Sequence, residues 1–171
     1  MRYIRFSNDP SAQHIDSVAR LLKAQRRLFT KKSDYPGHEA WTDRTITQIA
    51  ADAGKRAIVA TWGSEALGLV IYQRHPSDVT MVEVRNLSVR AKAEGLPVAH
   101  FLLGIVAREA AHDFPGTETL IGNAKITNEH VIDIATTSGW NVTGITTLVS
   151  PYGHNGIPDV VMTRSVIDSS H

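Results

Sequence analysis

Hydrophobic positions in the first third of the chain follow two different spacings. The short apolar stretch from Tyr3 to Phe6 predicts a strand. From Ile15 to Leu28, apolar residues recur every three or four positions and basic residues fill the other face, which is typical of an amphipathic helix. A polar loop at residues 30–41 comes next, and the helical spacing then resumes from Trp41 until an expected end near Gly54. Two helices are therefore expected after the first strand.

The middle of the chain contains apolar runs of strand length. Residues 56–62 and 66–73 are rich in β-branched side chains and flank a turn at residues 63–65, which predicts a β-hairpin. Residues 80–89 alternate between apolar and polar and predict a third strand. The longest amphipathic stretch of the chain, residues 97–114, follows after a loop and predicts a helix.

The last third repeats the change from strand to helix. Residues 118–126 predict a strand, and residues 127–139 a short helix that stops at a glycine. Two further strands are expected at residues 140–150 and 159–167, joined by the loop at residues 151–158. This order of elements is typical of an α/β or α+β fold in which helices cover a single sheet.

Composition favours one domain that spans residues 1–171. With 42% hydrophobic and 20% charged residues, a chain of this length can bury a core without metal or disulfide support. The 18 Lys and Arg residues nearly balance the 17 Asp and Glu residues, so the net charge of +1 does not favour a nucleic-acid or membrane partner. No repeat, low-complexity stretch or linker divides the chain.

Cysteines, histidines and apolar runs indicate which cellular compartment and which kinds of site to expect. The chain has no cysteine, which excludes disulfides, thiolate metal sites and a cysteine nucleophile and is compatible with a reducing cytoplasm. Its eight histidines include no pair at the spacing of a helical zinc site, so no metal is expected. No apolar run has the length of a signal peptide or a bilayer span, and we expect a cytoplasmic protein.

The segment RAKAEGLPVAHFLL, residues 90–103, joins a predicted strand to the longest predicted helix. Backbone N–H groups at a helix N-terminus can bind a pyrophosphate whatever the side chains are, because the helix dipole favours an anion there. Gly95 permits an unusual backbone torsion, and Pro97 suits the first turn of a helix. An ordinary strand-to-helix turn explains these residues equally well.

Residues of the same loop affect phosphate binding in opposite ways. Pro97 has no N–H to offer to a phosphate. Glu94 would repel a phosphate charge, by about 2 kcal/mol at a separation of roughly 8 Å and an effective dielectric of about 20. Arg90 and Lys92 could offset that repulsion.

Four segments match motifs of one family in the family's order. They are the strand end and loop with Leu87, Ser88, Val89, Gly95, Leu102 and Leu103; the segment with Asn128, Gly139 and Trp140; the hairpin with Gly68; and the last strand with Asp159 and Met162. Together they resemble the GNAT acyltransferases, the acetyl-coenzyme A-dependent N-acetyltransferase superfamily, over nearly the whole chain. The resemblance implies a mostly antiparallel mixed sheet of about seven strands flanked by four helices.

The resemblance also implies a cofactor site for acetyl-coenzyme A. Backbone groups of Leu87 and Val89 would pair with the pantetheine arm like an added strand, and Asn128 would lie beside that arm. The pyrophosphate would take N–H donors from the start of the helix. The complete set of implied cofactor residues is Leu87, Ser88, Val89, Gly95, Leu96, Val98, Ala99, His100 and Asn128.

Acetyl transfer to an amine needs a neutral amine, a polarised acyl carbonyl and a proton for the leaving thiolate. Glu83 shares a strand face with Val89, at the offset where some relatives place a general base. An ion pair with Arg85 is its alternative role. Many relatives have a tyrosine acid where this chain has Ala135. Thr136, Ser138 or Tyr152 could replace it if folding brings one of them near the sulfur, and water could also serve.

These residues leave the function open between two classes. The first is an N-acetyltransferase that transfers an acetyl group by direct attack of an amine, on a small molecule or a protein, as a possible homodimer. The second is a catalytically inactive GNAT-fold binding or regulatory module. It is favoured by Glu94 and Pro97, which stand where the family's motif has an arginine and its second glycine, and by Ala135. Transfer of a longer acyl chain, or transfer to an aminoacyl-tRNA, has only the basic face of the first helix as support.

Overall fold

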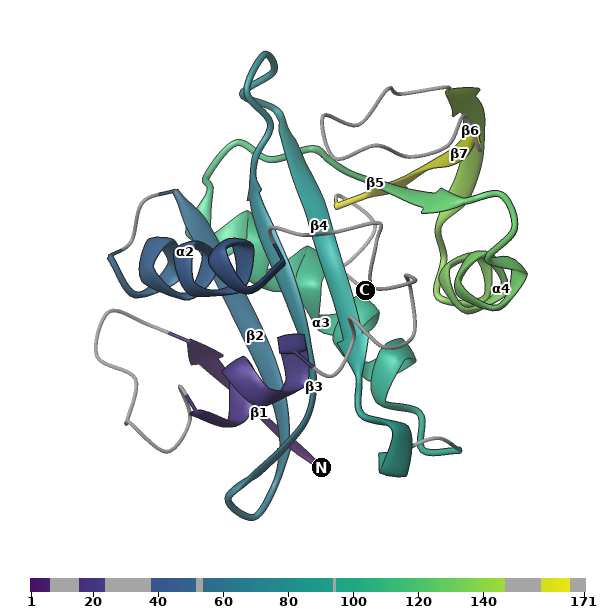
Figure 1. Ribbon diagram of the computed structural model, residues 1–171. Coiled ribbons are helices and arrows are strands. Elements are labelled where there is room, and N and C mark those ends of the chain that lie inside the picture. The colour runs from purple at the N-terminus through teal and green to yellow at the C-terminus, as the bar shows by residue number, and fades with distance from the viewer. Residues whose placement is uncertain (7–15, 24–37, 52–53, 94, 147–157, 167–171) are drawn as a thin grey trace. The chain divides into compact units, whose positions relative to one another are not determined.

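Figure 1 shows a computed structural model of the chain, which describes residues 1–6, 16–23, 38–51, 54–93, 95–146 and 158–166. Residues 16–23 are helical. The other elements are β1 (Arg2–Phe6), α2 (His38–Ala50), β2 (Lys55–Trp62), β3 (Glu65–Arg74), β4 (Met81–Val89), the 3₁₀-helix η1 (Ala91–Ala93), α3 (Val98–Asp113), β5 (Thr119–Lys125), α4 (Glu129–Thr137), β6 (Asn141–Thr146) and β7 (Asp159–Ser165).

The strands form one mixed sheet in the order β1-β2-β3-β4-β5-β7-β6. β4 and β5 are parallel, whereas β1 with β2, β5 with β7 and β6 with β7 are antiparallel. A mixed, mostly antiparallel sheet of seven strands with the helical segment 16–23, α2, α3 and α4 confirms the predicted fold class.

Most predicted elements are found with small shifts at their ends. The predicted helix at residues 97–114 is α3, and the predicted strands at 80–89 and 118–126 are β4 and β5. The prediction was wrong at the start of the second helix, because α2 begins at His38 and not at Trp41. The short helix η1 between β4 and α3 was not predicted, since one turn of three residues carries no periodicity.

The chain divides into two compact units, which are described separately. The first contains Met1–Ile71 and Asn86–Leu102, and the second contains Tyr72–Arg85 and Leu103–His171. In the first unit, the helical segment 16–23 and α2 bury apolar side chains against β1, β2 and β3; this core contains Val18, Leu21, Leu22, Ile49, Ala57, Val59, Ala66, Leu69 and Ile71.

The second unit buries alternate residues of neighbouring strands. Leu120 and Ala124 of β5 and Val160 and Met162 of β7 are buried, as the two-residue period of a strand requires for one covered face. Trp140, between α4 and β6, is buried as well. Among the described residues, no helix combines the length and apolar character needed to cross a bilayer.

Candidate functional site

The loop between β4 and α3 turns twice before the helix begins. Ala93 N–H donates to Arg90 O at 2.8 Å, and Leu96 N–H donates to Ala93 O at 3.1 Å. Gly95 has φ +86°, a torsion that L side chains rarely adopt. A Cβ added at Gly95 would have no atom within 4 Å, so glycine is required for the torsion and the space around it is open.

The start of α3 determines which N–H groups can face outward. Phe101 N–H donates to Pro97 O at 2.9 Å, and Val98 N–H donates to Leu96 O at 2.7 Å. Of the predicted pyrophosphate donors, Leu96 and Val98 therefore give their N–H groups to carbonyls of the loop. Ala99 lies in the first turn, where helical geometry provides no acceptor for the N–H.

A close approach at Gly68 of β3 positions this loop. A Cβ added at Gly68 would lie 2.8 Å from Ser88 O, 2.8 Å from Val98 Cγ1 and 3.2 Å from Leu102 Cδ1. Ser88 is itself buried, and its Oγ donates to Asn86 Oδ1 at 2.7 Å. The absent side chain of Gly68 thus lets the beginning of α3 pack directly on β3, next to the Ser88 carbonyl of β4.

Two cations of the loop bind a carboxylate of the same unit. Arg90 Nη1 and Lys92 Nζ both form ion pairs with Glu65 Oε1, at the first residue of β3. The hydrogen bond from Lys92 and then the charges of Lys92 and Arg90 lower the pKa of Glu65 below its ordinary value. Arg90 N–H also donates to Leu67 O at 2.8 Å. Arg90 and Lys92, which were expected to offset the repulsion of a phosphate by Glu94, are therefore also paired with Glu65.

Glu83 lies on β4 in the second unit with both carboxylate oxygens hydrogen-bonded. Its Oε1 is 2.6 Å from Arg85 Nη1, and its Oε2 accepts a hydrogen bond from Gln73 Nε2 at 3.3 Å. The Glu83 side chain is 20% exposed, so the carboxylate reaches solvent. The ion pair with Arg85, the alternative role predicted for Glu83, is present. It leaves the Glu83 carboxylate accessible to solvent.

The ladder between β4 and β5 is short. It runs from Met81↔Thr119 to Val84↔Gly122. β4 continues to Val89 and β5 continues to Lys125 beyond this last pair. Parallel strands that continue past their shared ladder leave backbone groups that another extended chain can pair with.

The remaining predicted residues lie at the start of α3, around α4 or outside the described part of the chain. Asn128 precedes α4 and makes no side-chain capping bond, although its carbonyl accepts from Val131 N–H at 3.1 Å and Ile132 N–H at 3.2 Å. Ala135 of α4 is buried. His100 is exposed on the first turn of α3. Tyr152 lies outside the described residues.

Sequence reasoning missed one polar atom in the second unit. Trp140 is 3% exposed, and within the described part of the chain its Nε1 is buried without a hydrogen-bond partner. Its Cζ3 lies 3.5 Å from the position that a Cβ would take on Gly122. The sequence marks Trp140 as a motif and core residue, and nothing in it indicates that the indole N–H has no acceptor.

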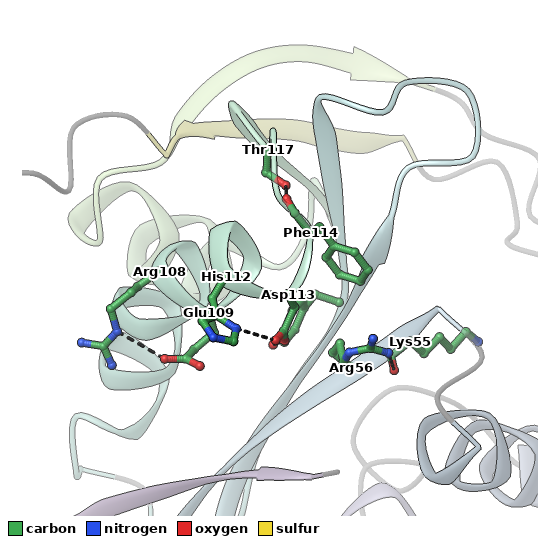
Figure 2. Close-up of polar contacts among 9 residues, drawn as sticks. Lys55, Arg56, Arg108, Glu109, His112, Asp113, Phe114 and Thr117 are labelled. Atoms are coloured by element: carbon green, nitrogen blue, oxygen red, sulfur yellow. Dashed lines mark hydrogen bonds and ion pairs between the residues drawn. The ribbon is translucent and has the colours of Figure 1, made fainter. Parts of the chain in front are cut away.

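Further polar contacts gather near the C-terminal end of α3 (Figure 2). Arg108 Nε is 3.2 Å from Glu109 Oε1, and His112 Nδ1 is 3.2 Å from Asp113 Oδ1. Asp113 Oδ2 also accepts a hydrogen bond from the buried Tyr72 hydroxyl at 2.5 Å. The bond from Tyr72 fastens the end of α3 to β3 within the second unit, and the other two join neighbouring residues of α3, so we assign these contacts to stability.

No family model matches the sequence, and no curated protein matches it either. Solved structures do match along nearly the whole chain. A protein from Desulfovibrio desulfuricans described as an acetyltransferase of the GNAT family has a TM-score of 0.77 at 13% identity, over 96% of this chain and 98% of that chain.

Two further solved structures match to a similar degree. A ribosomal-protein-alanine N-acetyltransferase from Brucella melitensis has a TM-score of 0.71 at 14% identity, over 96% of this chain and 99% of its own. An aminoglycoside 6'-N-acetyltransferase complexed with coenzyme A has a TM-score of 0.68 at 16% identity, over 97% of each chain. The chain therefore has the fold of the GNAT acetyltransferases.

Proposed function

We propose that this chain is an N-acetyltransferase of a single domain, residues 1–171, that uses acetyl-coenzyme A as its cosubstrate. The observation that carries the proposal is the way β4 ends. β4 extends five residues, from Arg85 to Val89, beyond its last pair with β5. The chain then turns through Gly95 into α3. This is the strand, turn and helix N-terminus that an extended cofactor with a pyrophosphate needs.

The proposed cofactor contacts are mainly backbone groups. Leu87, Ser88 and Val89 would present main-chain groups to the pantetheine arm, since the Ser88 hydroxyl is already bonded to Asn86. Gly95, Ala99 and His100 would provide N–H groups for the pyrophosphate, whereas Leu96 and Val98 would contribute only if their loop bonds exchange. Asn128 would donate from its side-chain amide, which makes no capping bond.

The proposed chemistry is a direct transfer. The thioester supplies an activated acetyl group, and the carbon–sulfur bond breaks as the new carbon–nitrogen bond forms. Glu83 would accept the proton that the amine loses, directly or through a water molecule. Tyr152 would give a proton to the thiolate. The reach of Glu83 to solvent supports a base role, whereas its ion pair with Arg85 occupies one carboxylate oxygen.

The acceptor is proposed as an amine of a small molecule or a protein. Proteins of this fold include an aminoglycoside N-acetyltransferase and a ribosomal-protein-alanine N-acetyltransferase, so the fold accommodates both kinds of acceptor. Fold alone does not select between them.

The proposal is tested by calorimetric titration with acetyl-coenzyme A. We expect a dissociation constant in the micromolar range, and Gly95→Ala should weaken it, because a side chain at φ +86° strains the loop. Gly116→Ala is a matched control, since Gly116 also has φ +86° and open space around it but lies after α3. Absence of binding at millimolar acetyl-coenzyme A would refute the proposal.

An inactive binding module is the second candidate. It is favoured by Ala135, which cannot supply a proton, and by the ion pair that holds Glu83 to Arg85. The two candidates differ in one measurement. The enzyme releases free coenzyme A when a mixed panel of amines is added with acetyl-coenzyme A, whereas the module binds the cofactor without releasing the thiol.

A further inference from the structure

One carboxylate and two cations form a solvent-accessible cluster where β3 begins. Arg90 Nη1 and Lys92 Nζ both pair with Oε1 of Glu65, so two positive charges share one carboxylate oxygen. The side chains of Lys92 and Glu65 are 58% and 39% exposed. The hydrogen bond from Lys92 lowers the pKa of Glu65, and the charges of Lys92, Arg90 and Arg20 act in the same direction. Glu65 is therefore ionised at neutral pH, and positive charge predominates around it.

The backbone keeps both cations close to the proposed phosphate donors. Ala93 N–H donates to Arg90 O, and Leu96 N–H donates to Ala93 O, so two successive tight turns connect Arg90 with the start of α3. A turn of this kind brings its two end residues within about 7 Å of each other. Lys92 lies three residues before Gly95, where an added Cβ would meet no atom within 4 Å. The cations, the loop and the start of α3 all belong to the first unit, and the space beside Gly95 is open.

A phosphate group is a stronger partner for these cations than the carboxylate that they contact. A phosphate monoester carries a charge of about −1.5 to −2 at neutral pH and has three acceptor oxygens. Arginine and lysine both bind phosphate through charge-assisted hydrogen bonds. Exposed ion pairs, in contrast, contribute little to stability, so the pairs with Glu65 can exchange.

We propose that Glu65 competes with a phosphate group of acetyl-coenzyme A for Arg90 and Lys92. This inference rests on the proposed function. In the free protein Glu65 holds the two cations, and the arriving phosphate replaces it on them; no covalent bond changes. Coenzyme A offers two sources of phosphate, the pyrophosphate and the 3′-phosphate of the ribose. Glu65 thus lowers the affinity for the cofactor, while Arg90 and Lys92 raise it.

The test measures the binding of coenzyme A and 3′-dephospho-coenzyme A by calorimetry. Glu65→Gln keeps the size of the side chain and removes its charge, so we expect it to bind coenzyme A about two- to fivefold more tightly than the wild type at low salt. Lys92→Gln should bind coenzyme A about two- to fivefold more weakly, because it loses a cation and leaves Glu65 in place. Both differences should shrink at high salt, which screens exposed charges.

Two further variants make the same changes of charge elsewhere. Glu118→Gln removes an exposed negative charge from the second unit, and Arg44→Gln removes an exposed positive charge from α2. Both should bind coenzyme A as the wild type does. The melting temperature of Glu65→Gln provides a second readout, since the variant loses two ion pairs. Lower stability combined with tighter binding is expected of a competitor, whereas a purely structural role would weaken binding.

Each outcome decides the inference. A gain of affinity in Glu65→Gln for coenzyme A alone supports it and identifies the 3′-phosphate, and a gain for both ligands supports it and identifies the pyrophosphate. Equal or weaker binding of coenzyme A by Glu65→Gln overturns it and leaves the proposed function intact. Unchanged binding by Lys92→Gln, or an equal gain in Glu118→Gln, overturns it as well. If the wild type binds neither ligand, the proposed function fails and this inference fails with it.

Discussion

Gly68 and Ser88 lie so close that a single added carbon at position 68 would be 2.8 Å from the Ser88 carbonyl oxygen. The same carbon would be 2.8 Å from Val98 Cγ1, at the start of α3. The absence of a side chain on β3 therefore determines how closely β4 and α3 can each approach β3 in the first unit. Substitution at Gly68 tests whether this approach also stabilises the fold.

We expect Gly68→Ala to lower the free energy of unfolding by about 1–3 kcal/mol, because the backbone at Ser88 must move to accept a methyl group. Urea denaturation measures the change. Gly104→Ala is the matched control, since a Cβ at Gly104 meets no atom within 4 Å and alanine favours a helix by up to about 1 kcal/mol. Equal stability of Gly68→Ala and the wild type would show that the close approach can relax at no cost.

Substitution of Glu83 tests its proposed role as a base. Glu83→Gln keeps the shape of the side chain and removes the proton acceptor, so we expect turnover to fall about a hundredfold or more while the dissociation constant of acetyl-coenzyme A stays the same. Steady-state kinetics and calorimetry give the two values. Arg85→Gln removes the ion pair and leaves the carboxylate, and it should cost far less turnover. Unchanged turnover in Glu83→Gln would exclude Glu83 from the mechanism.

The pH dependence of stability tests the contacts of Glu65 with Arg90 and Lys92. Because these contacts lower the pKa of Glu65 in the folded state, their contribution is complete above the pKa of the unfolded chain and is lost as pH falls through the folded pKa. The difference in melting temperature between the wild type and Glu65→Gln should therefore be largest near neutral pH and shrink in acid. The residues are exposed enough for salt to screen them, so high salt should reduce the same difference. A difference that is constant with pH would contradict the assignment.

The hydrogen bond from Tyr72 to Asp113 tests how the end of α3 is fastened. Tyr72→Phe leaves the Asp113 carboxylate without its 2.5 Å donor, and we expect a loss of about 1–3 kcal/mol in the free energy of unfolding. His112→Ala removes a second contact of Asp113, made by a side chain that is 66% exposed, and it should cost less than about 1 kcal/mol. Similar losses of unfolding free energy in both variants would show that the bond from the buried Tyr72 hydroxyl stabilises the fold no more than the exposed His112 contact does.

Local patterns predict the fold of this chain because they depend on near neighbours. The alternation of residues 80–89 and the helical spacing of residues 97–114 predict β4 and α3, with ends that differ by only a residue. A glycine permits an unusual torsion at position 95, and Gly95 has φ +86°. These features are set by residues within a few positions of one another.

Contacts between distant positions could not be predicted in this way. Glu65 and Arg90 are far apart in sequence, and only the pairing of strands brings them together. The ladder between β4 and β5 stops at Val84↔Gly122 although both sequences continue as strands, so no pattern marks the end. The missing acceptor of Trp140 depends on all the atoms around one nitrogen, which a sequence does not specify.

The double attachment of the loop before α3 has a practical consequence for protein engineering. Arg90 is held to β3 by a backbone bond to Leu67 and by the Glu65 carboxylate, which also binds Lys92. Glu65 directly follows the hairpin turn at Gly63 and Ser64. Exposed turns are the usual places for affinity tags and fluorescent labels. In this chain a label in that turn would pull on the loop, so reporter groups are better placed at the turn around Gly116.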